Sequence, residues 1–154
     1  MFRWHGIWRA ALAVLAALAL MGLTAGGALA APAADVQGTG RIWASGSGYA
    51  RLAGSGEVRI NRGFGEVRIR NAEEVIATGR GQRETLRDGT VRIWGWDGEV
   101  TVRGKDMTVE ILGARIGFTA AGRGTVLLKG RGVYKTASGQ GTWRAAGAQV
   151  RFGQ

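Results

Sequence analysis

The residues from Ile42 to Ile60 alternate between two classes of side chain. The even positions are apolar or glycine, and the odd positions are mostly polar or aromatic. A period of two is typical of extended backbone with one face turned inward. Two Gly-x-Gly pairs, at residues 46–48 and 54–56, recur eight residues apart on the apolar face. Because glycine has no Cβ, these pairs predict bends or close approaches of another backbone segment.

The alternating pattern restarts along the chain. GEVRI begins at Gly56, GTVRI at Gly89 and GTVLL at Gly124, so the restarts lie 33 (89 − 56) and 35 (124 − 89) positions apart. Within each unit, strand-like segments follow one another at intervals of about eight or nine residues, and no segment beyond the N-terminal region has a helical period. The sequence therefore predicts one all-β repeat domain over residues 41–154.

Two architectures fit this repeat, and we favour a β-solenoid-like stack of short strands. Two strands then make one coil of about 16–18 residues, and successive coils stack in parallel. Valines one coil apart form an inward ladder in this arrangement: Val58, Val75, Val91, Val109 and Val126.

The alternative is an antiparallel β-sandwich or small barrel, in which successive segments pair as a meander. Val58 then faces Val67, and Glu57 faces Arg68. Opposite charges face each other in this register, and antiparallel pairs are the commoner kind.

The N-terminal segment, residues 1–30, has the features of a secretory signal peptide. Arg3 and Arg9 precede an apolar run over residues 10–23, and small-residue cleavage patterns end at Ala30 and Ala33. We expect a signal-peptide helix over 1–30, a flexible lead-in over 31–40, and export to the periplasm, cell surface or medium. The alternative is an uncleaved membrane anchor. After cleavage, no membrane span is expected.

The composition restricts the chemistry. The chain has no cysteine, which excludes disulfides and a lipoprotein anchor, and its only histidine, His5, lies in the signal peptide. Thiol nucleophiles, Ser-His pairs and zinc sites therefore have no residues in the mature domain. Glu73 and Glu74 are the only adjacent acids, and neighbours in a strand point to opposite faces. We expect no catalytic residue, metal or cofactor, and no enzymatic activity.

The charge balance indicates an anionic partner. From Ala31 onward there are 19 basic and 11 acidic residues, a net charge of 19 − 11 = +8. Arg92, Trp94 and Trp96 share one parity and are the candidate ligand-binding residues, because arginine beside flat aromatic rings suits an anionic polymer. The competing interpretation is a solvated basic face with the tryptophans packed over glycine gaps. A specific nucleic-acid partner is not expected of an exported protein.

The glycine spacing also carries a resemblance. The pattern GxGxAxLxGxGxVxI from Gly46 and the later GTVLLKGRGVY resemble uncharacterised exported bacterial proteins built of glycine-punctuated β-repeats. They are more distantly similar to adhesin-head domains that fold as β-helices. The resemblance implies a solenoid and a role at the cell surface. We expect an exported, non-enzymatic cell-envelope or surface β-repeat protein with a structural, adhesion-like role. The alternative is a secreted or periplasmic module that binds an anionic glycan through exposed Arg and Trp.

Overall fold

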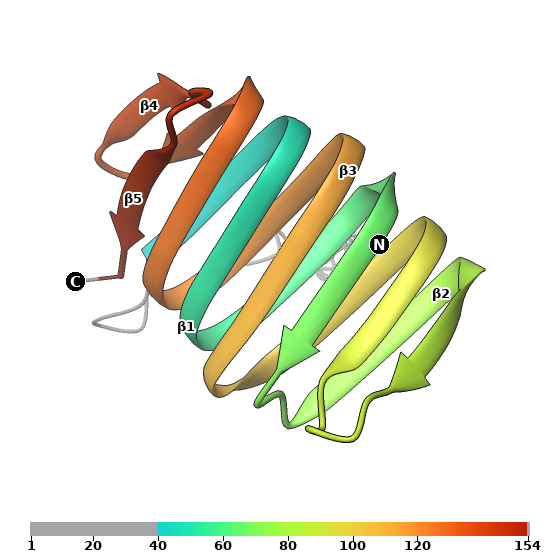
Figure 1. The fold of residues 1–154 in the computed structure, drawn as a ribbon. Helices are drawn as coiled ribbons and strands as arrows, with labels where there is room; N and C mark the ends of the chain where they lie inside the picture. The colour runs from blue at the N-terminus through green and yellow to red at the C-terminus, as the bar shows by residue number, and fades with distance from the viewer. Residues whose placement is uncertain (1–39, 154) are drawn as a thin grey trace, which may run out of the picture. The chain divides into compact units, whose positions relative to one another are not determined.

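The protein is an all-β domain, as its alternating sequence predicts (Figure 1). The computed structural model describes residues 40–153. Its five strands are β1 (Gly40–Arg70), β2 (Glu74–Thr85), β3 (Val91–Thr136), β4 (Gly139–Thr142) and β5 (Ala148–Phe152). The predicted signal peptide and nearly all of the lead-in lie outside the described residues. Within the described range, no helix is long and apolar enough to cross a membrane.

The two long strands, β1 and β3, wind together and alternate along the domain (Figure 1). Leu52 of β1 lies between Val109 and Val126 of β3, and both pairings are antiparallel. These two β3 partners are 126 − 109 = 17 positions apart, so one turn of β3 has the length predicted for a coil. The neighbour of each β3 turn is the oppositely directed β1, however, and not the next turn of the same strand.

This winding shows that two predictions were wrong, the parallel stack that we favoured and the register of the alternative meander. The described sheet is antiparallel throughout its strand pairs, so the predicted ladder of successive parallel coils does not form. Val58 faces Val102 and Ala120, and not Val67 as the meander requires. Alternation and glycine spacing are the same in either chain direction, so they did not distinguish parallel from antiparallel pairing. The sheet is also not closed into a barrel, because β2 lies at one end of the strand order.

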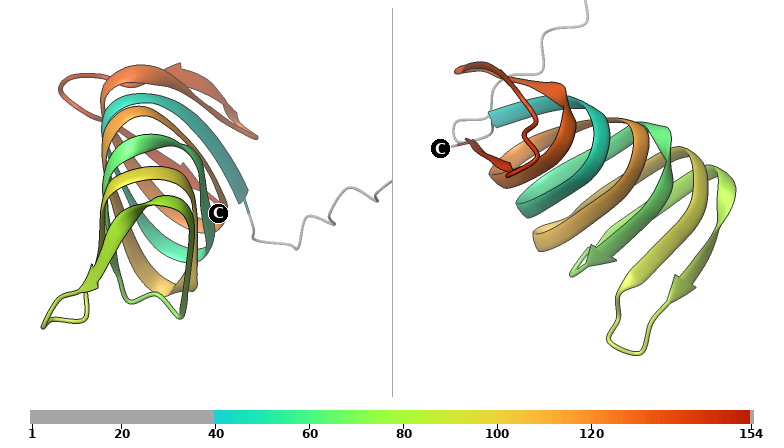
Figure 2. Two further views of the ribbon diagram at one scale, coloured as in Figure 1. Left: turned by 90° about the vertical axis from the view of Figure 1, so that its right-hand side faces the viewer. Right: turned by 45° about the horizontal axis from the view of Figure 1, so that its top comes forward.

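Each turn is flattened into two facing layers, which Figure 2 shows from two further sides. The first layer contains residues 42–45, 57–60, 74–78, 99–103, 117–121, 133–136 and 139–142. The second layer contains residues 49–53, 66–70, 82–85, 91–94, 107–112, 124–128 and 148–152. The strands pass from one layer to the other at two rows of corners. The fold is thus an antiparallel sandwich whose layers share the same long strands.

The core lies between the two layers. Val109 is fully buried between Leu52 and Ile69 of the neighbouring β1 turns, and Phe118 is fully buried between Ala44 and Ile60. Burying a side chain of this kind contributes about 1.5–3 kcal/mol relative to leaving it exposed. Each of these inward residues of β3 packs between one β1 residue on either side. The core is therefore continuous along the domain.

The two ends of the core differ. Trp143 and Phe152 are buried at the end formed by β4 and β5. At the other end, β2 is almost wholly exposed, including Ile76. The β4–β5 end of the described domain therefore carries buried aromatic side chains, whereas β2 is an exposed edge.

Glycine is required at the corners because two backbones touch there. Gly56 and Gly122 lie opposite each other with φ of 136° and 134°. A Cβ on Gly56 would lie 2.1 Å from the carbonyl oxygen of Ala121, and one on Gly122 would lie 2.1 Å from that of Ser55. The Gly-x-Gly pairs therefore mark both a bend and a close backbone approach.

Candidate functional site

One row of corners brings together four arginines from segments that are distant in sequence. We call it the basic corner, and its side chains are Ser47, Arg62, Phe64, Arg80, Asp97, Arg115 and Arg131. Arg131 lies opposite Ser47, Phe64 opposite Asp97, and Asp97 opposite Arg80. Segments of β1, β2 and β3 that are distant in sequence therefore contribute neighbouring side chains to one row.

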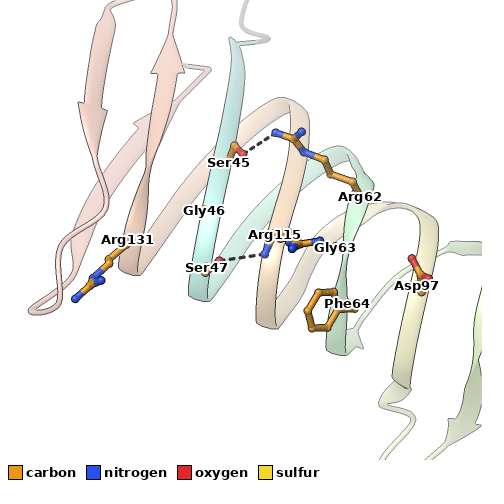
Figure 3. Close-up of a pocket in the computed structure, with 9 residues that line it drawn as sticks. All are labelled: Ser45, Gly46, Ser47, Arg62, Gly63, Phe64, Asp97, Arg115 and Arg131. Carbon is orange, nitrogen blue, oxygen red and sulfur yellow. Dashed lines mark hydrogen bonds between the residues drawn. The ribbon is translucent and has the colours of Figure 1, made fainter.

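The basic corner contains an open groove with a volume of about 780 Å³ (Figure 3). Arg62, Arg115 and Arg131 line it together with Ser45, Ser47, Phe64 and Asp97. All three arginines are exposed, and the ring of Phe64 is 51% exposed. A solvent-accessible groove with three guanidinium groups offers forked N–H donors of the kind that bind carboxylates and phosphates.

Hydrogen bonds hold part of this groove in place. The Arg62 guanidinium donates to the Ser45 hydroxyl at 2.8 Å, and the backbone N–H of Arg115 donates to the Ser47 hydroxyl at 3.0 Å (Figure 3). Within residues 40–153, the guanidinium groups of Arg115 and Arg131 have no hydrogen-bond or ion-pair partner. Their donors are therefore available to a ligand.

The opposite row of corners is electrically balanced. Over residues 54–56, 71–73, 104–106 and 122–124, Lys105 and Arg123 are matched by Glu73 and Asp106, a net charge of 2 − 2 = 0. The basic corner has four arginines and one aspartate, a net charge of 4 − 1 = +3. Of the two rows of corners, only the basic corner is therefore net positive.

The outward faces of the layers use their arginines differently. Arg103 binds Glu57 at 2.6 Å and Glu74 at 2.8 Å across neighbouring strands. In all, five arginines pair with six glutamates within the described residues: Arg51, Arg59, Arg68, Arg92 and Arg103 with Glu57, Glu66, Glu74, Glu84, Glu99 and Glu110. Hydrogen bonds from Arg103 lower the pKa of Glu57, and those from Arg92 lower the pKa of Glu66. The glutamates on these faces are therefore paired within the fold, whereas basic residues near the β4–β5 end, such as Lys135 and Arg151, have no ion-pair partner among the described residues.

The sequence-predicted ligand residues do not form one exposed surface. Arg92 and Trp94 lie on the outward face, with the guanidinium 5.0 Å from the centre of the Trp94 ring. Arg92 also pairs with Glu66 and Glu84, so its charge is already matched. Trp96 is only 1% exposed and belongs to the core, so the expectation that it shares the outward face is corrected.

Trp96 points inward because of Gly95. Glu66 lies opposite Trp94 and Gly65 lies opposite Trp96, so Gly95 has no partner across that pair and forms a β-bulge. Its φ of 59° is left-handed, which glycine adopts readily. The extra residue reverses the alternation and turns Trp96 inward.

Sequence reasoning did not identify the groove residues. Arg131 lies between Gly130 and Gly132, and Arg115 lies two positions after Gly113. A basic residue between or beside the glycines of a predicted corner was the available signal. Which corners share a row depends on the pairing of β1 with β3, which the sequence pattern did not specify.

No known protein family, curated protein or solved structure matches this chain. In the part of the chain that the structure describes, no three His, Cys, Asp or Glu side chains are placed to hold a metal ion. The chemistry that the groove offers is hydrogen bonding and charge attraction from guanidinium and hydroxyl groups, with the ring of Phe64 beside them.

Proposed function

We propose that this protein is an exported, non-catalytic domain of the cell envelope or cell surface with an adhesion-like role. In this proposal it attaches to an anionic polymer through the basic corner. The observation that carries the proposal is the groove lined by Arg62, Arg115 and Arg131, in which the guanidinium groups of Arg115 and Arg131 lack partners among residues 40–153. Export is supported by the signal-peptide features of residues 1–30.

The rigidity of the corner favours binding. Arg131 is held between two glycines whose backbones touch the opposite strand, since a Cβ on Gly130 would lie 2.3 Å from the carbonyl oxygen of Ser47. Arg115 is held by the hydrogen bond to Ser47. The backbone at Arg115 and at Arg131 is therefore held in place before binding. Less conformational entropy is then lost when a polymer docks.

The test compares two double variants that each remove two positive charges. Arg115→Asn/Arg131→Gln changes the basic corner, and Lys105→Gln/Arg123→Gln changes the opposite corner. Arg123 is a matched control because it also lies between two glycines, Gly122 and Gly124. The purified protein is titrated with envelope fragments and with acidic polysaccharide at low and moderate salt.

We expect the basic-corner variant to lose at least about tenfold in affinity, and the control to lose much less. Affinity should fall with ionic strength for the unaltered protein. An equal loss in both double variants would mean attraction to net charge alone. No saturable binding by the unaltered protein would contradict the proposal.

A further inference from the structure

A second depression lies next to the basic corner, on the outward face of the second layer. It has a volume of about 230 Å³ and is lined by Tyr49, Glu66, Arg68, Glu110 and Leu112. Leu112 is 59% exposed, the largest exposed fraction among the exposed large hydrophobic residues of the described range. We call this depression the layer hollow. None of its residues belongs to the basic corner.

The layer hollow and the basic corner are joined by bare backbone. Gly113 lies opposite Gly48 on one side and Gly65 on the other, so three glycines align across three neighbouring strands. Ser47 and Phe64 of the basic corner directly precede Gly48 and Gly65 in the chain. The glycine strip therefore has no side chain that separates the groove from the hollow, and a ligand in one can extend into the other.

The layer hollow has a different chemistry from the groove. Leu112 and the half-buried Tyr49 ring provide apolar surface. The Tyr49 hydroxyl donates to Glu110 at 2.9 Å, and burial, followed by this bond, raises the pKa of Tyr49. Hydrogen bonds from Arg92 and Arg68 lower the pKa of Glu66, so this carboxylate is ionised at neutral pH and accepts hydrogen bonds.

This combination suits an uncharged sugar ring. The apolar face of a sugar packs on Leu112 and Tyr49, and its hydroxyl groups donate to carboxylate oxygens. Glu66 is paired with Arg68 and Arg92, and Glu110 is paired with Arg51. The charges that line the hollow are therefore matched, so an anionic group finds unpaired guanidinium groups in the groove but not in the hollow. The two adjoining sites thus suit different chemical groups, an anionic one in the groove and an uncharged one in the hollow.

We propose that the layer hollow is a subsite for an uncharged sugar, and that the polymer is a glycan in which acidic and neutral sugars alternate. This inference rests on the proposed function, since the acidic sugar occupies the basic corner. A nucleic acid fits less well, because it carries a phosphate on every nucleotide and the hollow has no unpaired guanidinium group to bind one.

The experiment measures binding of the full chain to three probes. These are an oligosaccharide of alternating glucuronate and N-acetylglucosamine, an oligogalacturonate of equal charge, and inorganic polyphosphate. The variant is Leu112→Ser, which alters an exposed side chain and leaves the charge unchanged. The matched control is Ile76→Ser, since Ile76 is 47% exposed on the first layer and lines neither the groove nor the hollow. Thermal melting checks that both variants fold.

We expect the unaltered protein to bind the alternating oligosaccharide most tightly. Leu112→Ser should weaken that binding about tenfold, by analogy with loss of one stacking contact, and Leu112→Met should restore it. Binding of polyphosphate should change less than about twofold in every Leu112 variant, because the basic corner is unaltered.

Two results would overturn the inference in distinguishable ways. If all three probes bind equally, and Leu112→Ser has no effect while Arg115→Asn/Arg131→Gln weakens binding, the subsite is wrong and the proposed function stands. If no probe binds saturably, the proposed function and the subsite are both wrong. Tightest binding to polyphosphate would favour a phosphate polymer and also overturn the alternating glycan.

Discussion

The hydroxyl of Ser47 accepts a hydrogen bond of 3.0 Å from the backbone N–H of Arg115, which lies 68 positions later in the chain. The same relationship recurs at the opposite corner, where Ser55 accepts from the N–H of Asp106 at 3.1 Å. Arg115 and Asp106 both have a φ of 53°, a left-handed conformation that is unfavourable for a residue with a Cβ. The serine within each Gly-Ser-Gly segment therefore holds the corner of the neighbouring strand in place.

The Ser47–Arg115 contact predicts different effects on stability and on binding. Ser47→Ala should lower the free energy of unfolding by about 1 kcal/mol, since the Arg115 N–H loses its partner. Arg115→Gly removes the left-handed cost of roughly 1–2 kcal/mol and should leave stability unchanged or higher, while binding of anionic polymer weakens. Urea unfolding and titration check both effects. Ser45→Ala is the control, and a loss as large as that of Ser47→Ala would contradict the assignment.

Close backbone approach predicts that corner glycines differ from exposed ones. Gly122→Ala should destabilise the domain by about 1–3 kcal/mol, because its Cβ would overlap the Ser55 carbonyl oxygen. Gly139→Ala is the matched control, since Gly139 also has a positive φ but a Cβ there would meet no atom within 4 Å. Denaturant unfolding measures both variants. Equal destabilisation would mean that backbone strain, and not contact, requires glycine at the corners.

The alternation of β3 predicts opposite outcomes at adjacent residues. Val109 is fully buried between Leu52 and Ile69, so Val109→Asp should cost about 3 kcal/mol or more by burying an unpaired carboxylate. Thr108 points outward opposite Arg70, so Thr108→Asp should change stability by less than about 1 kcal/mol. Thermal melting of the two variants checks the prediction. Similar melting temperatures would mean that the inward and outward faces are misassigned.

The glutamates of the layer faces predict acid sensitivity. Glu57 and Glu66 have pKa values below the ordinary 4.5, chiefly through hydrogen bonds from Arg103 and Arg92. A carboxyl whose folded pKa is lowered contributes stability that is complete above its unfolded pKa and lost as pH falls through the folded pKa. Stability should therefore begin to fall near pH 4.5 and decrease further at lower pH.

The contribution of each pair is small, because solvent screens charges at the surface. Unfolding measured between about pH 7 and pH 2.5 tests the prediction, with Arg103→Gln as the comparison. The variant should show a smaller acid loss, since the pKa of Glu57 returns toward its ordinary value. An identical pH profile for variant and unaltered protein would mean that the Arg103 pairs do not contribute.

The N-terminal pattern predicts processing. Residues 1–30 have the basic, apolar and small-residue regions of a signal peptide, so the exported protein should begin at Ala31 or Ala34. N-terminal sequencing of the exported protein checks this. A chain that keeps His5 and stays in the membrane fraction would mean that the segment is an anchor.

The sequence by itself determined the local structure of the domain. Alternation from Ile42 to Ile60 was enough to predict extended strands and an all-β fold, because side chains on a strand face opposite sides in turn. The spacing of the glycine pairs and of the strand-like segments was enough to predict the corners and the length of one coil. Both features depend only on residues close together in the chain.

The tertiary structure alone decided the direction of pairing and the location of the site. A pattern of period two reads the same in both chain directions, so alternation did not distinguish parallel turns from the antiparallel winding of β1 with β3. One glycine at position 95 reversed the alternation and placed Trp96 in the core. Arg62, Arg115 and Arg131 meet in one groove because long-range backbone pairing aligns their corners, and no local feature of the sequence specifies that pairing.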